Sequence, residues 1–150
     1  MTLKDKINQD LKTALLGGDK LKSGTLRELK AVVLNEEVAQ GKRDEGLDDM
    51  TIEKLIVREV KKRNESATIY EEADRSELAL NERSEANVLS QYLPEQLSEA
   101  DIEKVVERVI KEQGADNISA IGKTIGFVKK ELGNSADGAL IAKIVKNKLI

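Results

Sequence analysis

The sequence predicts an all-α protein, and three observations lead to that fold class. Of the 150 residues, 35% are charged and 39% apolar, only 2% are aromatic, and there is a single proline. Such a composition, rich in Lys, Glu, Leu, Ile and Val, is typical of helical proteins. Apolar residues recur three and four positions apart along most of the chain, which is the repeat of one helix face. No segment shows the sustained alternation of a half-buried strand, so we expect no sheet.

The single proline, Pro94, divides the predicted helices into two groups. A proline lacks the backbone N–H and disfavours helix at the residue before it. We therefore interpret residues 92–98 as the boundary between two helical subdomains, a larger N-terminal one (residues 1–93) and a three-helix C-terminal one (residues 94–150). The alternative is an ordinary helix–helix turn inside one domain, since 150 residues suffice for one domain or two small ones.

Two helices are predicted before a polar loop. Thr2 can cap the first, whose apolar face repeats every four residues from Leu3 to Leu15, and the glycine pair at 17–18 ends it. Asp19 can cap the second, which is expected to end near Gly41. Residues 41–50 are polar and contain two glycines, which favours a loop.

Two further helices are predicted between this loop and the proline. Asp49 or Thr51 can cap the third, which is expected to run to about Ala73. The fourth is expected from Arg75 to Tyr92. The third helix also carries a basic cluster, formed by Arg58, Lys61, Lys62 and Arg63.

The last 57 positions predict three short helices. Ser98, with Asp101 three residues later, resembles a capping box for the fifth, and Gly114 ends it. Ser119 is the expected cap of the sixth, and Gly133 its end. A turn over residues 134–138 leads into the seventh helix, and each of the three must pack on its neighbours to be stable.

The composition excludes several kinds of chemistry. With no cysteine and no histidine, the chain offers no disulfide, thiolate nucleophile or imidazole base. It contains neither a phosphate-binding glycine loop nor a Gly-x-Ser-x-Gly elbow, and no spacing singles out a carboxylate pair. We therefore expect no catalytic residue, no metal site and no cofactor. No apolar run approaches the ~20 residues of a membrane span, and no signal peptide is visible, so we expect a cytoplasmic protein without membrane contact.

Charge is distributed unevenly along the chain. Residues 1–118 carry 19 basic and 26 acidic side chains, a net charge of −7, whereas residues 119–150 carry six lysines and two acids, a net charge of +4. The stretch 65–103 holds eleven acids against two arginines and would repel phosphates. The basic end is a candidate nucleic-acid face, and an ordinary solvated surface is the alternative.

A pair of glycines marks the candidate site within this basic end. Gly122 and Gly126 lie four residues apart, on one face of the sixth helix. Each costs about 1 kcal/mol relative to alanine in a helix, which suggests a close approach by another group. That group is a neighbouring helix of the same subdomain, or an RNA backbone or partner protein on a lysine-edged face. Both can hold together, because the glycines could pack inward while Lys123 and Lys130 point outward. The candidate RNA-binding residues are these two glycines with Lys123, Lys129, Lys130, Lys143 and Lys146.

Several segments in order resemble one protein family. The segment Tyr92-Leu93-Pro94-Glu95-Gln96-Leu97-Ser98 is followed by Gly122-Lys123, Gly126, Gly133, Ala136-Asp137-Gly138 and a lysine-rich last helix. Together with Arg27-Glu28-Leu29-Lys30 and Arg58-Glu59-Val60-Lys61-Lys62-Arg63, these segments resemble the YqeY-like proteins, the stand-alone relatives of the GatB tail, over nearly the whole chain. One departure lies at Ile125-Gly126-Phe127, where the family pattern leads us to expect a methionine near Ile125.

The resemblance implies two all-α subdomains and a link to tRNA. In GatB, a subunit of the glutamine-dependent tRNA amidotransferase, the similar tail contacts tRNA, and nothing in this chain corresponds to its catalytic core or to its amidase partner. The first hypothesis is a tRNA-binding accessory module, free or acting with an amidotransferase or translation-related protein. The second is a protein–protein adaptor without nucleic-acid binding. An enzyme acting alone is a distant third.

Overall fold

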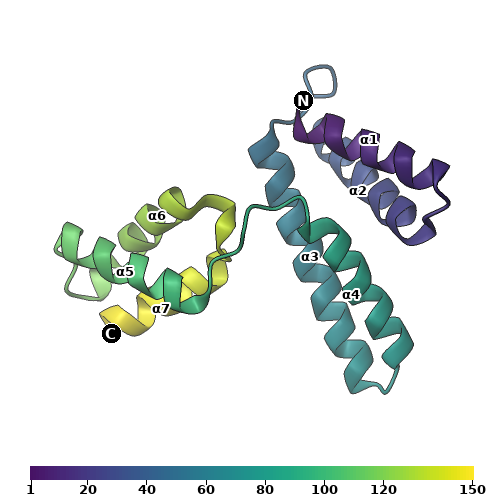
Figure 1. Cartoon of the computed structure of the whole chain (residues 1–150). Helices are drawn as coiled ribbons and strands as arrows, with labels where there is room; N and C mark the ends of the chain where they lie inside the picture. Colours follow the sequence, from purple (N-terminus) through teal and green to yellow (C-terminus); the bar gives the residue numbers. More distant parts are fainter. The chain divides into compact units, whose positions relative to one another are not determined.

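The computed structural model describes all residues 1–150 and contains seven α-helices and no strand, which confirms the all-α prediction (Figure 1). The helices are α1 (Leu3–Leu16), α2 (Lys20–Ala39), α3 (Asp49–Glu72), α4 (Ser76–Ser90), α5 (Glu99–Gln113), α6 (Ile121–Leu132) and α7 (Gly138–Leu149). They form two compact units, Met1–Leu93 and Pro94–Ile150. None of the helices combines the length and the apolar composition that crossing a membrane requires.

Local capping chemistry sets the start of most helices. Thr2 caps α1 in a full capping box with Asp5, and Asp19 caps α2. The cap of α3 is Asp48, whose Oδ1 accepts the Thr51 backbone N–H at 2.8 Å, so the prediction of Asp49 or Thr51 was wrong by one residue or more. Asp49 instead accepts the Leu3 N–H at 2.9 Å, which joins the starts of α1 and α3.

The start of α6 also differs from the prediction. Ser119 lies inside a 3-10 turn (Ile118–Ala120) that precedes the helix, and Asn117 caps this turn by accepting the Ser119 N–H at 3.0 Å. The Ser119 hydroxyl donates to the same Asn117 side chain, so it does not cap α6. Ser98 caps α5 as expected, and Asp137, in the predicted turn over residues 134–138, caps α7.

The N-terminal unit is built around α3. Figure 1 shows α4 running antiparallel beside α3, while α1 and α2 pack near the beginning of α3. Its core consists of aliphatic side chains from these helices, namely Ile7, Leu11, Leu26, Leu29, Val33, Ile52, Leu55, Ile56 and Leu89. Tyr92 joins the end of this unit to α1, because its hydroxyl donates to Asp10 Oδ2 at 2.6 Å.

The C-terminal unit packs α5, α6 and α7 around a core of its own. The central side chains are Ile102, Val106, Val109, Val128, Ile141 and Val145. The segment after Pro94 belongs to this unit, since the Leu97 N–H donates to the Ser135 carbonyl at 2.8 Å and Gln96 Nε2 donates to the Asn134 carbonyl at 2.9 Å. These bonds hold the entry to α5 against the connection between α6 and α7.

Candidate nucleic-acid interface

Helix α6 has one buried and one exposed side. Thr124 and Val128 are almost fully buried, and they fix the orientation of the helix against α5 and α7. The opposite side presents Lys123, Phe127 and Lys130 to solvent, and Lys123 and Lys130 are two turns apart on the same face. The amphipathic pattern of α6 therefore determines which lysines are accessible.

The two glycines of α6 lie on the exposed part of the helix. Beyond the adjoining backbone of α6 itself, a methyl group added at Gly122 or Gly126 would meet no atom within 4 Å. The hypothesis that a neighbouring helix of the same subdomain packs tightly on them is therefore wrong. What they provide is a flat, accessible stretch of backbone beside Lys123, at a cost in helix stability that no contact within the chain explains.

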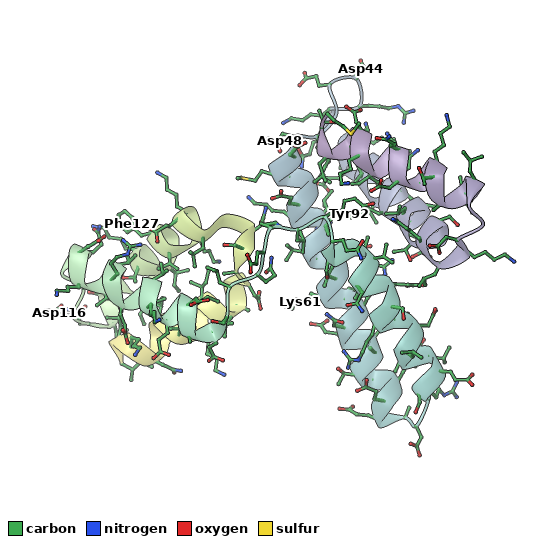
Figure 2. All side chains as sticks on the ribbon, viewed as in Figure 1. Asp44, Asp48, Lys61, Tyr92, Asp116 and Phe127 are labelled. Atoms are coloured by element: carbon green, nitrogen blue, oxygen red, sulfur yellow. The ribbon has the colours of Figure 1, made fainter.

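Phe127 adds an aromatic ring to this surface. The Lys123 ammonium lies 6.0 Å from the centroid of the ring, and Phe127 is 40% exposed. Figure 2 labels Phe127. This distance is at the outer limit of a cation–π contact. The sequence prediction gave Phe127 no role, although a lysine four residues before an aromatic residue on a helix is a signal for such a pair.

The remaining lysines of the candidate site lie at the end of α6 and on α7. The Lys129 side chain lies against Gly138, the first residue of α7, where an added methyl group would be 3.1 Å from Lys129 Cε. Lys143 and Lys146 are exposed and lie three residues apart on α7. The five lysines thus occupy exposed positions on two helices that pack together.

Ion pairs divide the charges of the basic end into two groups. Lys148 contacts Glu103 at 2.8 Å and Glu107 at 2.7 Å on α5, and these hydrogen bonds raise the pKa of Lys148 to about 12. Glu131 pairs with Arg108 of α5. The five candidate lysines, in contrast, make no ion pair within the chain. Their charge is available to an external anion.

The basic cluster predicted on α3 is only partly a surface feature. Arg63 is buried and contacts three carboxylates, Glu28 of α2 at 2.7 Å, Glu85 of α4 at 3.2 Å and Glu59 at 3.5 Å. Burial raises the pKa of Glu85 in spite of the arginine beside it. Arg63 therefore joins α2, α3 and α4, and its charge does not contribute to the surface formed by the rest of the cluster.

The rest of that cluster forms a second basic surface. Arg58, Lys61 and Lys62 are exposed on α3, where Figure 2 labels Lys61. Unlike α6, this part of α3 has no exposed glycine or phenylalanine beside its basic residues. No group of three or more Asp or Glu side chains in the chain is placed to hold a metal ion.

Comparison with known proteins places the chain in a family. The family model described as Yqey-like protein matches residues 4–149. A protein of Lachancea thermotolerans named "Altered inheritance of mitochondria protein 41, mitochondrial" is 31% identical over 116 residues, which cover 75% of this chain and 60% of the relative. The protein of the same name from Vanderwaltozyma polyspora is 29% identical over 87 residues, which cover 58% of this chain and 46% of the relative. The chain thus spans about half of the length of these curated relatives.

Proposed function

The chain belongs to the YqeY-like family, and from this premise we propose that it is an RNA-binding helical module whose contact surface is the exposed side of α6. The observation that carries the proposal is that α6 presents two exposed glycines and three exposed lysines without ion pairs, and that α7, which packs on α6, adds Lys143 and Lys146. From the resemblance to the GatB tail we propose tRNA as the ligand, bound by an accessory protein that acts alone or with an amidotransferase or translation-related protein in the cytoplasm.

The charge and shape of this surface suit a sugar–phosphate backbone. Each free ammonium group can neutralise one phosphate and release a counterion, which is the main source of affinity in such contacts. At Gly122 and Gly126 no side chain separates the helix backbone from an approaching ligand, so phosphates can come near Lys123 and Lys130 together. The cost of two helical glycines is understandable if this approach is their function.

The aromatic content limits how the surface can read RNA. Phe127 is the single phenylalanine of the chain, and its half-exposed ring lies beside Lys123. Proteins that bind unpaired bases stack them on several aromatic side chains, whereas duplex RNA is contacted through phosphates and 2′-hydroxyls. We therefore expect weak, shape-directed binding with little dependence on base sequence.

Charge reversal at two surfaces tests the proposal. In the variant Lys123→Glu/Lys130→Glu, affinity for fluorescently labelled tRNA in 50 mM salt should fall about 100-fold. Log affinity falls with log salt at a slope of about −0.9 for each neutralised phosphate. Between 1 M and 50 mM salt, each phosphate contact therefore changes the affinity roughly tenfold, and two lost contacts change it about 100-fold. The matched control is Arg58→Glu/Lys61→Glu on α3, which changes the net charge equally and should lower affinity much less.

Two results would overturn the proposal. A larger loss in the α3 variant than in the α6 variant would place the RNA contact on the other basic surface. An absence of tRNA binding in the unaltered protein would favour the second hypothesis, a protein–protein adaptor.

Circular dichroism spectra of both variants should match that of the unaltered protein, because all four altered side chains are exposed.

A further inference from the structure

A cavity of about 280 Å³ lies between α1 and α2, with Ile52 of α3 among its lining residues. This volume is close to the lower end of the range for ligand pockets, roughly 300–1,000 Å³. Most of the wall is carbon, supplied by Ile7, Val33 and Leu34. Four polar side chains complete the lining, namely Lys4, Asn8, Lys30 and Glu37.

Glu37 brings a buried carboxylate to this cavity. It is 2% exposed, and its Oε2 accepts hydrogen bonds from Lys4 Nζ at 2.7 Å and from the Leu47 N–H at 3.3 Å. Both bonds fall on the same oxygen, and Oε1 accepts none from the chain. Glu37 Oε1 is therefore free to accept a hydrogen bond from a molecule outside the protein.

Asn8 supplies a second acceptor without a partner. Its Oδ1 is buried and accepts no hydrogen bond within the chain. Buried polar atoms are almost always paired, and an unpaired one lowers stability. Asn8 and Glu37 both line the cavity, but Asn8 Oδ1 is closed off from solvent, so Glu37 Oε1 is the acceptor that a ligand with an N–H or O–H donor can reach.

Lys30 adds a positive charge at the rim. It lies in the lining, its side chain is exposed, and it makes no ion pair with the chain. Lys4 is already matched by Glu37, so the polar lining carries one unbalanced positive charge. This charge disfavours a cationic ligand and favours one with an anionic group at the opening.

We propose that this cavity is a binding site for a small heteroaromatic carboxylate with a ring N–H. The ring would lie against the aliphatic wall, its N–H would donate to Glu37 Oε1, and its carboxylate would pair with Lys30. The site lies in the N-terminal unit, and it is independent of the RNA contact proposed for α6.

Three related probes test the proposed chemistry on the full chain. Indole-3-acetate has all three features, naphthalene-1-acetate lacks the N–H, and indole lacks the carboxylate. In ¹⁵N-labelled protein, indole-3-acetate should shift amide resonances of α1 and α2. The naphthalene acid should bind about fivefold more weakly, the loss of one hydrogen bond, and indole about threefold more weakly, the loss of an exposed ion pair.

A blocking variant ties any binding to the cavity. Ala31 is exposed and lines the opening, so Ala31→Phe should abolish the shifts without disturbing the core. Ala39→Phe, at an exposed alanine of the same helix outside the cavity, is the control and should leave binding unchanged. The proposal is overturned if indole-3-acetate at 5 mM shifts no α1 or α2 resonance, if Ala31→Phe binds it as well as Ala39→Phe, or if the naphthalene acid binds equally well.

Discussion

Replacing Gly122 and Gly126 together by alanine should stabilise the C-terminal unit. Both glycines lie inside α6, and beyond the adjoining backbone of that helix the added methyl groups would meet no atom within 4 Å, so neither exchange introduces a clash. Each exchange is worth about 1 kcal/mol, because alanine loses less backbone entropy in a helix, and the pair should give about 2 kcal/mol. For a unit of this size that amount raises the Tm by roughly 8–16 °C.

The assay is thermal unfolding followed by circular dichroism, with amide hydrogen exchange to locate the gain in α5–α7. Gly114→Ala is the matched control in the same unit. Gly114 also has open space around it, but its φ of +63° is strained for alanine, so that variant should lose about 1 kcal/mol. A lower Tm in the double variant would refute the reasoning, because it would mean that the structure requires glycine at these positions.

Three further predictions concern the N-terminal unit. Tyr92→Phe should cost about 2 kcal/mol in urea unfolding, because it removes the bond to Asp10. Burial raises the pKa of Tyr92, so the folded state favours the protonated phenol. The contribution of this phenol to the free energy of unfolding should be fully present below pH ~10 and should fall above it. Tyr92→Phe should lessen that fall. Lys4→Ala should lower the free energy of unfolding by about 3 kcal/mol, because it leaves the Glu37 carboxylate buried without its cation. The control Lys6→Ala, at an exposed site, should change the unfolding midpoint little. Limited trypsin digestion should cut first within residues 42–45, which are exposed and join α2 to α3, and initial cleavage inside a helix would contradict this.

The helices could be predicted from the sequence because their ends depend on neighbouring residues. Gly17 and Gly114 end helices where they were expected to, and Thr2 and Ser98 cap helices through the backbone N–H three residues later. The start of α6 was missed for a related reason. Asn117 and Ser119 are both residue types that cap helices and lie two positions apart. Capping propensity alone does not show that Asn117 caps the 3-10 turn and that Ser119 lies inside it.

The burial of individual polar residues could not be predicted in this way. Arg63 reads as part of a basic cluster, and only the packing of α2, α3 and α4 shows that carboxylates from three helices surround it. Glu37 likewise looks like a surface residue until Lys4 and the backbone of Leu47 are brought to it by the fold. At the candidate site, spacing placed Gly122 and Gly126 on one face, but only the structure shows that this face is exposed.

The salt dependence of tRNA binding tests the central claim most directly. If about four phosphates are neutralised by the lysines of α6 and α7, log affinity should fall with log salt at a slope of roughly −3 to −4. In Lys123→Glu/Lys130→Glu the slope should become shallower by about 2, because two of these contacts are lost. A slope near zero in the unaltered protein, or the same slope in the variant, would contradict an RNA contact on the exposed side of α6.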